Sequence, residues 1–261
     1  MEKIKQALDK ARQERESNNT QIPSPASGKA KSVSNIQYTK TQSVDSSPVL
    51  MRENRLISTM EQGKYTDALK ILSTQVLHRM EENQWGSIAV TSPRLAAGKT
   101  TIAINLGLSI AKEVDYSVLL VDANLRHPNI HQYFGIEPEY GLSDYLTNEI
   151  ELSDILINPR GIDRFVLLPA GKPHPMSTEL LGSPRMCDLV KELTSKYPKR
   201  IIIFDLPSIL LTADALAFMP CVDCSLVVIE DDVTKESDLK AAIEMLSVTN
   251  VIGTVLNKSS Y

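Results

Sequence analysis

The sequence lacks the features that mark several large classes of protein. None of its apolar runs approaches the roughly 20 residues that a transmembrane helix needs. The net charge of −4 gives no basic footprint, which argues against nucleic acid as a partner. The opening residues are charged throughout and lack the apolar segment of a secretory signal. Together these absences predict a cytoplasmic protein.

Cysteine is scarce as well, and three cysteines are too few for a disulfide framework. Cys221 and Cys224 form one C-x-x-C pair, but a redox or zinc site would need a second pair or a thioredoxin-like setting. The pair directly precedes the apolar run SLVVIE. We therefore expect buried or half-buried thiols, with redox or zinc chemistry as the alternative.

The N-terminal segments differ in composition from the rest of the chain. Residues 1–16 place apolar side chains at helical spacing and predict an amphipathic helix, which docks on a partner, lies on a membrane surface or stays solvated. These apolar residues are Ile4, Ala7, Leu8 and Ala11. Residues 17–50 are rich in Ser, Asn, Thr, Gln, Pro and Lys and predict a flexible linker, because such a segment buries too little apolar surface to fold.

From Trp85 onward, short apolar runs alternate with helical stretches. The runs resemble the strands of a parallel sheet that is covered on both faces. The expected strands are 87–92, 117–122, 164–169, 200–205, 225–230 and 251–256. The expected helices are 66–82, 100–113, 184–196 and 235–248, with Ser183 and Thr234 as N-caps of the last two. This order predicts an α/β domain with a doubly wound, mostly parallel sheet, behind a disordered N-terminal tail.

The first expected strand leads through TSPRLAAGKTT into a helix, which is the arrangement of a phosphate-binding loop. Loop amides and the helix N-terminus would direct positive charge at phosphate oxygens. We expect Gly98 to allow close backbone approach, Lys99 to reach the β- and γ-phosphates, and Thr100 to bind Mg²⁺. The pattern G-x-x-x-x-G-K-[ST] is incomplete, because Pro93 replaces its first glycine. An incidental lysine at a helix start is the alternative.

Two further expected strands end in an aspartate, at the sheet edge where ligands bind. Asp205 resembles a Walker B carboxylate that holds Mg²⁺, and Asp122 would bind Mg²⁺ or accept a proton, or else cap the following turn. Arg126 would stabilise phosphate charge or form a surface ion pair, and Asn257 would pair with a purine edge or form a turn. The expected ATP-binding residues are Arg94, Ala96, Ala97, Gly98, Lys99, Thr100, Thr101 and Asn257.

These motifs resemble those of the bacterial tyrosine kinases of capsule and exopolysaccharide synthesis, which are related to the partition and septum-site ATPases. The resemblance covers residues 55–258 and rests on TSPRLAAGKTT as Walker A, VLLVDANLRHP as the family's extra motif, and RIIIFDLPS as Walker B. EYGLSDYL and AGKPHPMSTELLGSP resemble further family segments. The resemblance implies a P-loop fold, ATP and Mg²⁺ as cofactors, and an oligomeric autokinase beside a membrane co-polymerase or chain-length protein.

The sequence departs from the family pattern in four places. Ala96 and Ala97 precede Gly98 where the family usually has G-E, and Asn124 replaces the second aspartate of Asp-x-Asp. The family's oligomerisation motif, Glu-x-x-Arg-x-x-Arg-Thr, falls on positions Asp67, Lys70, Ser73 and Thr74. The tyrosine-rich tail is reduced to Tyr261, the expected phosphoacceptor, in the tail 259–261.

Three functions are therefore open. The first is an active tyrosine autokinase that uses Lys99, Asp122 and Arg126 for catalysis and Thr100, Asp122 and Asp205 for the metal. The second is a catalytically weak nucleotide switch that regulates the polysaccharide machinery by docking. A partition-type ATPase is a third, weaker hypothesis, because Arg94 stands where that subclass has a signature lysine.

Overall fold

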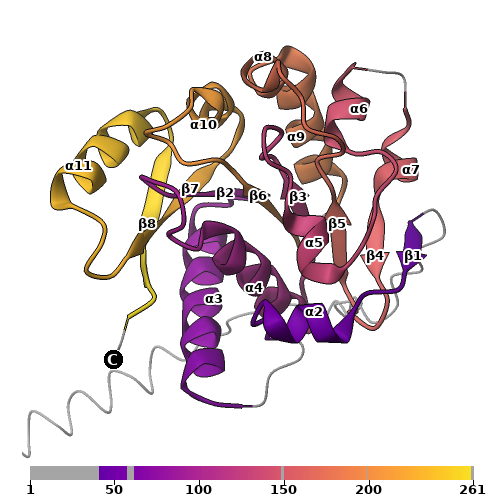
Figure 1. The fold of residues 1–261 in the computed structure, drawn as a ribbon, viewed down its shortest axis with the longest axis horizontal. Helices are drawn as coiled ribbons and strands as arrows, with labels where there is room; N and C mark the ends of the chain where they lie inside the picture. Colours follow the sequence, from indigo (N-terminus) through magenta and orange to yellow (C-terminus); the bar gives the residue numbers. More distant parts are fainter. Residues whose placement is uncertain (1–40, 58–61, 148–149, 198, 260–261) are drawn as a thin grey trace, which may run out of the picture. The chain divides into compact units, whose positions relative to one another are not determined.

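The computed structural model describes residues 41–57, 62–147, 150–197 and 199–259. The expected helix at 1–16, most of the expected linker and Tyr261 lie outside these ranges. The described residues include an eight-stranded sheet with the strand order β1-β4-β5-β3-β6-β2-β7-β8 (Figure 1). Its strands are β1 (Gln42–Val44), β2 (Ser87–Thr91), β3 (Ser117–Asp122), β4 (Ile157–Pro159), β5 (Phe165–Leu168), β6 (Arg200–Asp205), β7 (Cys224–Glu230) and β8 (Asn250–Asn257).

Neighbouring strands run parallel, except that β4 pairs antiparallel with β5. β2 lies between β6 and β7, so the chain passes from β2 to β3 on one side and later adds β7 and β8 on the other. Such a change of direction in an open α/β sheet leaves a crevice at the carboxyl ends of the strands. The predicted doubly wound, mostly parallel sheet is confirmed.

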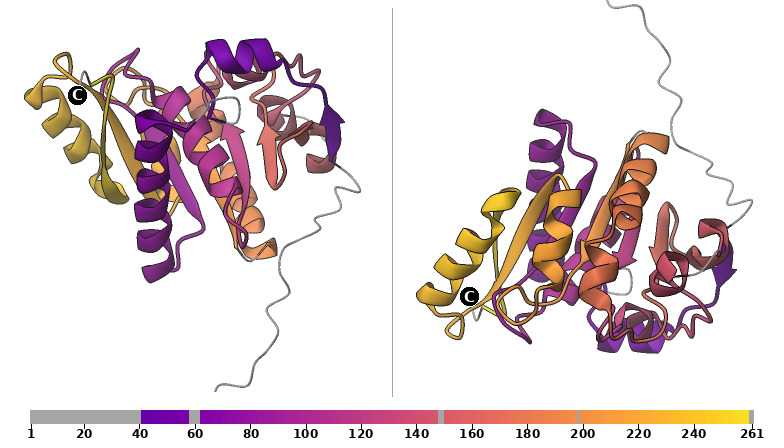
Figure 2. Two further views of the ribbon diagram at one scale, coloured as in Figure 1. Left: turned by 90° about the horizontal axis from the view of Figure 1, so that it is seen from below. Right: turned by 90° about the horizontal axis from the view of Figure 1, so that it is seen from above.

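Helices cover both faces of the sheet (Figure 2). One face packs against α2 (Pro48–Glu53), α3 (Lys64–Glu82), α4 (Lys99–Ala111) and α5 (Ile130–Phe134). The other packs against α6 (Leu142–Thr147), α8 (Ser177–Leu181), α9 (Pro184–Lys196), α10 (Asp214–Phe218) and α11 (Glu236–Met245). The remaining short helices are α7 (Leu152–Ile155), η1 (Met219–Cys221) and η2 (Leu246–Val248).

Alternate strand residues enter the two cores, as the two-residue period of a strand requires. In β6, Ile203 joins the core beneath α4, whereas Ile202 and Phe204 join the core beneath α9. Because both sets are apolar, the strand reads as one continuous apolar run. None of the helices in the described ranges combines the length and apolar character that crossing a bilayer requires.

One of the two predicted helix caps is correct. Ser183 caps α9, because its Oγ accepts a hydrogen bond from the amide of Met186 at 3.2 Å. Thr234 does not cap α11, which begins after Lys235. The Thr234 hydroxyl instead accepts from the amide of Glu230 at 2.8 Å and closes the turn that follows β7.

The last part of the predicted linker is ordered, contrary to the expectation from composition. Residues 42–44 form β1, which pairs with β4, and Ser47 caps α2 by accepting from the amide of Leu50 at 3.3 Å. The amide of Ser47 donates to the carbonyl of Phe134 at 2.7 Å, and Met51 is buried. The composition of 17–50 could not predict β1 or the start of α2, because the residues that they contact lie about 90 to 115 positions away in the sequence.

The cysteine prediction is wrong for Cys221 and correct for Cys224. Cys221, at the end of η1, forms a disulfide with Cys187 in the first turn of α9, and their Cα atoms lie 4.9 Å apart. Cys224 is a free, buried thiol, and burial raises its pKa to about 12, with the charge of Asp223 acting in the same direction. The C-x-x-C spacing did not predict this pairing, because the fold sets Cys221 beside a residue 34 positions away.

Two truncations test whether the core begins at β1. Removal of residues 1–40 is expected to leave the thermal midpoint unchanged within experimental error. Removal of residues 1–54 takes away β1 and the buried Met51. That loss should cost about 2–4 kcal/mol, which lowers the midpoint of a domain this size by at least about 4 °C. Equal midpoints for the two truncations would show that β1 and α2 contribute nothing to stability.

Candidate phosphate and metal site

The loop between β2 and α4 is fixed by hydrogen bonds to the segment that follows β6. Thr91 Oγ1 donates to the carbonyl of Pro207 at 2.8 Å, and the amide of Ile209 donates to the carbonyl of Ser92 at 2.9 Å. Within the loop, Ser92 Oγ donates to the carbonyl of Arg94 at 2.7 Å. The two strand ends that carry the expected Walker A and Walker B residues are thereby held together.

Two residues of this loop have left-handed backbone conformations. Gly98 has φ +87° and Ala96 has φ +65°. Glycine adopts this region freely, whereas a side chain with a Cβ pays roughly 1 kcal/mol or more. Ala96, where the family usually has glycine, therefore keeps the loop conformation at a cost in strain.

Asn257, at the end of β8, fastens the loop. Its Nδ2 donates to the carbonyl of Ala97 at 2.8 Å. A Cβ on Gly98 would lie 2.1 Å from this Nδ2, so only glycine fits beneath the Asn257 amide. The predicted purine contact would have to come from the other side of this amide, because its nitrogen is bound to the loop.

Two carboxylates lie side by side beneath the loop. The parallel register of β3 with β6 pairs Asp122 with Asp205, and both side chains are completely buried. Thr100 Oγ1 donates to Asp205 Oδ2 at 2.6 Å, and Lys99 Nζ lies 3.4 Å from Thr100 Oγ1. Burial raises the pKa of Asp205, whereas the Lys99 charge and the Thr100 hydrogen bond act to lower it. Asp205 Oδ1 has no hydrogen-bond partner among the described residues.

Asp122 is held by backbone amides. Its Oδ1 accepts from the amide of Asn124 at 3.1 Å, and its Oδ2 accepts from the amides of Asn129 and Ile130 at 3.0 Å each. Burial raises its pKa to about 7, and the Asp205 charge adds to this effect, while the three amide hydrogen bonds oppose it. The structure thus shows Asp122 in the capping role that the sequence left as an alternative.

The cavity above these residues has a volume of about 560 Å³. Its charged lining residues are the cations Lys99, Arg126 and Lys258. The other lining residues are Leu95, Ala96, Gly98, Thr100, Thr101, Asn124, His127, Asn129, Tyr133, Pro207, Ser208, Leu211 and Thr212. Cationic side chains around a glycine loop at a helix N-terminus fit a polyphosphate.

The donor set also fits a hard divalent cation. The described residues contain no cluster of three or more His, Cys, Asp or Glu side chains suited to a metal. Mg²⁺ is commonly bound through one or two protein oxygens together with phosphate oxygens and water. The Thr100 hydroxyl, which lines the cavity, and the unpartnered Oδ1 of Asp205, to which Thr100 is hydrogen-bonded, supply such oxygens.

No family model matches the sequence. The chain is 29% identical over 211 residues to the tyrosine-protein kinase YwqD of Bacillus subtilis (strain 168), covering 79% of this chain and 86% of that protein. It is 28% identical over 189 residues to the putative tyrosine-protein kinase CapB of Staphylococcus aureus, covering 72% and 81%. The kinase domain of the Escherichia coli tyrosine kinase ETK superposes with a TM-score of 0.69 at 25% identity, over 84% of this chain and 91% of that chain.

Over most of its length, the chain is therefore similar to bacterial tyrosine kinases. The septum site-determining protein MinD from Pyrococcus horikoshii, solved in complex with Mg-ADP, has the same fold at greater distance. Its TM-score is 0.55 at 22% identity, over 67% of this chain and 72% of that chain. The family and the septum-site ATPases therefore share the architecture that the sequence motifs predict.

Three of the predicted ATP-binding residues do not line the cavity: Arg94, Ala97 and Asn257. Arg94 forms a bidentate pair with Asp238 of α11, with Nε to Oδ2 at 2.6 Å and Nη2 to Oδ1 at 3.0 Å. This pair raises the pKa of Arg94 and lowers that of Asp238. In this structure the guanidinium of Arg94 is bound by a carboxylate of α11, and Arg94 as an ATP contact stays a prediction.

The helix that matches the family's oligomerisation motif is α3, and it presents only part of that motif to solvent. Lys70 and Asp67 are exposed and form an ion pair at 3.6 Å. Ser73 is buried, and its Oγ lies 2.8 Å from that of Ser109 in α4. The position where the family has its second arginine therefore faces the core here, while Thr74 stays exposed.

Several residues near the site were not predicted from the sequence. Tyr133 lies 3.4 Å from Thr101 through their hydroxyls, and Lys258 lines the cavity while pairing with Glu230 at 2.9 Å. Arg126 binds Asp214, for which no role was predicted. Only Lys258 had a local signal, since it directly follows Asn257 at the end of a strand.

The strain at Ala96 predicts a stabilising substitution. Ala96→Gly should raise the free energy of unfolding by about 0.5–1 kcal/mol, because glycine adopts the left-handed conformation without the Cβ clash. The matched control is Ala97→Gly, whose backbone has no positive φ and whose methyl is buried, and it should destabilise by a similar amount. Urea unfolding of both variants checks this, and a destabilised Ala96→Gly variant would contradict it.

The raised pKa values of Asp122 and Asp205 predict a pH-dependent stability. The folded protein keeps protons that the unfolded chain loses above about pH 4, so these groups make the folded state less stable as pH rises from about 4 through 7. In Asp205→Asn the free energy of unfolding should therefore fall less between pH 5 and pH 8 than it does in the wild type. The measurement is urea unfolding in EDTA at both pH values.

The test compares the pH dependence of the free energy of unfolding of Asp205→Asn with that of the wild type. Burial lowers the pKa of His131, which adds stability with rising pH in both proteins. Asp188→Asn, an exposed carboxylate on α9, is the control and should leave the pH dependence unchanged. Parallel pH profiles for wild type and Asp205→Asn would contradict the predicted coupling of the buried pair.

Proposed function

We propose that this protein is an ATP- and Mg²⁺-dependent protein-tyrosine kinase that acts in exopolysaccharide or capsule synthesis. The observation that carries the proposal is the buried Thr100–Asp205 contact beneath the Gly98-Lys99 loop, with one Asp205 oxygen unpartnered. A buried, unpaired carboxylate oxygen is costly unless a ligand binds it. The relatives named as tyrosine-protein kinases support the same chemistry.

In this proposal the chain's own residues bind and orient the phosphates. Lys99, the loop amides and the start of α4 hold the β- and γ-phosphates. Thr100 and Asp205 hold the Mg²⁺, which supplies neutralisation of phosphate charge when bound. Phosphoryl transfer depends mostly on positioning and electrostatics, so few residues are needed.

Asp122 would orient the acceptor tyrosine hydroxyl or take its proton as the phosphate is transferred. A pKa of about 7 suits a general base at neutral pH. Both of its oxygens accept backbone amides, so this role requires the 124–129 loop to release one of those bonds. We further propose Tyr261 as the phosphoacceptor, presented by a neighbouring copy in a homo-oligomer, and a membrane co-polymerase as the partner at the inner face of the membrane.

A second candidate is a nucleotide-dependent switch with weak or no transfer activity. Asn124 favours it, because this residue replaces a family carboxylate and its Oδ1 is engaged by the amide of His127 at 3.4 Å. A partition-type ATPase is a third candidate. Incubation with γ-labelled ATP separates the three: label on the protein indicates a kinase, free phosphate alone indicates an ATPase, and neither indicates a switch.

Lys99→Ala should abolish nucleotide binding and leave the fold intact, because Lys99 lines the cavity and is only half-buried. The wild type should gain about 2.7 kcal/mol of stability from Mg·ATP at a hundredfold excess over Kd, and the variant should gain none. Thermal unfolding with and without nucleotide measures this. An equal gain for both proteins would refute the assignment of the phosphate loop.

Tyrosine phosphate should depend on Lys99 and should concentrate on Tyr261. Phosphopeptide mass spectrometry of the wild type and Lys99→Ala after incubation with Mg·ATP is the measurement. Tyr261→Phe is the matched variant and should lose most of the label. If the wild type binds ATP but carries no phosphotyrosine, the switch replaces the kinase as the better hypothesis.

A further inference from the structure

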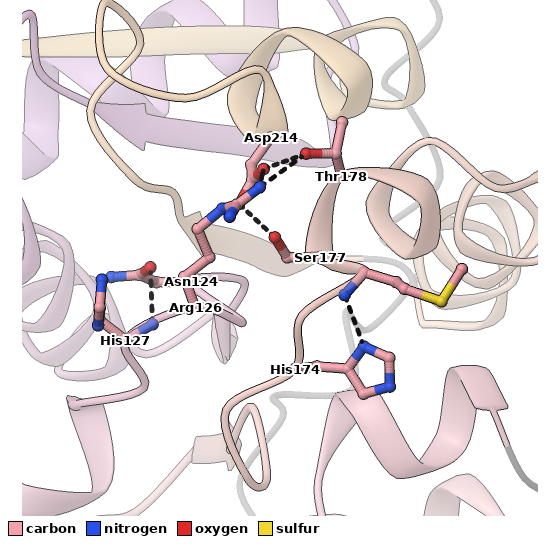
Figure 3. Close-up of polar contacts among 8 residues, drawn as sticks. Asn124, Arg126, His127, His174, Ser177, Thr178 and Asp214 are labelled. Atoms are coloured by element: carbon pink, nitrogen blue, oxygen red, sulfur yellow. Dashed lines mark hydrogen bonds and ion pairs between the residues drawn. The ribbon is translucent and has the colours of Figure 1, made fainter.

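We propose that Asp214 is a positioning residue that, with Ser177 and Thr178, holds the Arg126 guanidinium at the phosphate cavity so that it contacts the terminal phosphate of ATP (Figure 3). The inference rests on the proposed function, because it assumes that this cavity binds ATP. It assigns a role to Asp214, which no sequence motif had marked, and to Ser177 and Thr178, whose roles had not been predicted.

Asp214 is the centre of the cluster. It begins α10, and its side chain is completely buried. Arg126 Nε donates to its Oδ2 at 2.9 Å, Arg126 Nη2 donates to its Oδ1 at 3.1 Å, and Ser177 Oγ donates to its Oδ2 at 2.8 Å. Thr178 Oγ1 also donates to Oδ1. Burial acts to raise the pKa of Asp214, but these hydrogen bonds and the Arg126 charge outweigh it and lower the pKa.

Arg126 is placed between this carboxylate and the cavity. Its side chain is 39% exposed and lines the same cavity as Lys99 and Thr100. The fork on Asp214 uses Nε and Nη2, and Nη2 also donates to Thr178 Oγ1 at 3.2 Å. Nη1 has no hydrogen bond to any of the described residues. A guanidinium fixed on one edge retains donors for an anion on another.

Three distant segments converge to build this position. Arg126 comes from the loop after β3, Thr178 from α8, and Asp214 from α10. A backbone hydrogen bond from the amide of His174 to the carbonyl of Leu125, at 2.8 Å, joins the first two segments beside the cluster. Figure 3 shows Arg126 reaching from this loop toward Asp214, with Ser177 and Thr178 beside the carboxylate. Such over-determination fixes a long, flexible side chain in one geometry.

The position of Arg126 across the cavity suggests which phosphate it contacts. Lys99, Thr100 and the loop amides lie together at the start of α4, whereas Arg126 enters from the loop after β3. The near phosphates of a nucleotide would lie on the loop, and a third phosphate would extend toward β3 and Arg126. A donor there would also stabilise the charge that develops on the transferred phosphoryl group.

A second arginine pair provides the matched control. Arg94 and Asp238 also form a bidentate pair, but Arg94 does not line the cavity. The variants are therefore Arg126→Ala, Asp214→Asn and their combination, beside Arg94→Ala and Asp238→Asn. The measurement is the Kd of Mg·ADP and of the Mg²⁺ complex of an imido-bridged, non-hydrolysable ATP analogue, by titration calorimetry with the full chain.

Arg126→Ala should weaken binding of the triphosphate about tenfold or more and binding of Mg·ADP less than about twofold, as expected for loss of one charged hydrogen bond. Asp214→Asn should show the same selectivity with a smaller loss, and it should add nothing in the Arg126→Ala background. Arg94→Ala and Asp238→Asn should leave the ratio of the two Kd values unchanged. If Asp214→Asn does not fold, Ser177→Ala and Thr178→Ala each remove one hydrogen-bond donor to Asp214. Each should then lower the Kd of Mg·ADP divided by the Kd of the triphosphate analogue, as Arg126→Ala does.

Two results would overturn the inference alone: equal weakening of both nucleotides, or an Asp214→Asn effect that persists when Arg126 is absent. Each would make the pair purely structural. Because the titrations require no phosphate transfer, a wild type that binds both nucleotides but forms no phosphotyrosine refutes the kinase function and leaves this inference standing. A wild type that binds neither nucleotide overturns both.

Discussion

The parallel pairing of β3 with β6 places two buried carboxylates side by side, and much of the surrounding structure compensates for this placement. Two like charges without solvent cannot both ionise freely. Asp122 is accommodated by three backbone amides from the loop that leads into α5. Asp205 is accommodated by the Thr100 hydroxyl and the Lys99 charge at the start of α4. The loop after β2 and the loop after β3 thus both fold toward the same pair, and the cavity between them is where a cation and a polyphosphate fit.

The Arg94–Asp238 and Arg126–Asp214 pairs have the same hydrogen-bond pattern but differ in burial and in whether the arginine lines the cavity. Both use a bidentate fork on an aspartate. Arg94 is 62% exposed and turned toward α11, so its pair ties the loop to a surface helix and adds little, as exposed ion pairs generally do. Asp214 is completely buried and its pair with Arg126 borders the cavity, so loss of either partner would leave an unpaired charge next to the site.

The departures from the family pattern concern the loop and the charge of the site more than its framework. Ala96 holds the left-handed conformation that glycine would take without strain, so the loop geometry survives the substitution. Asn124 removes one carboxylate from the β3 end, while Asp122, Asp205, Thr100 and Lys99 stay together at the edge of the sheet, where we propose that phosphate and Mg²⁺ bind. The framework for nucleotide binding is therefore separable from the chemistry of transfer, which is the distinction between a kinase and a switch.

The sequence by itself determined the parallel sheet, the phosphate loop and the two strand-end carboxylates. These features depend on local patterns: a continuous apolar run predicts a doubly covered strand, and parallel strands bring their carboxyl ends to one edge. The N-cap at Ser183 could also be predicted, because it depends on a residue only three positions away. Only the tertiary structure decided the partner of each side chain. In it, Arg94 binds Asp238 and Arg126 binds Asp214. The Asn257 amide donates to the loop, Cys187 forms a disulfide with Cys221, and β1 pairs with β4. Each of these contacts joins segments at least 34 residues apart, and no local periodicity reports which distant segments the packing of the two cores brings together.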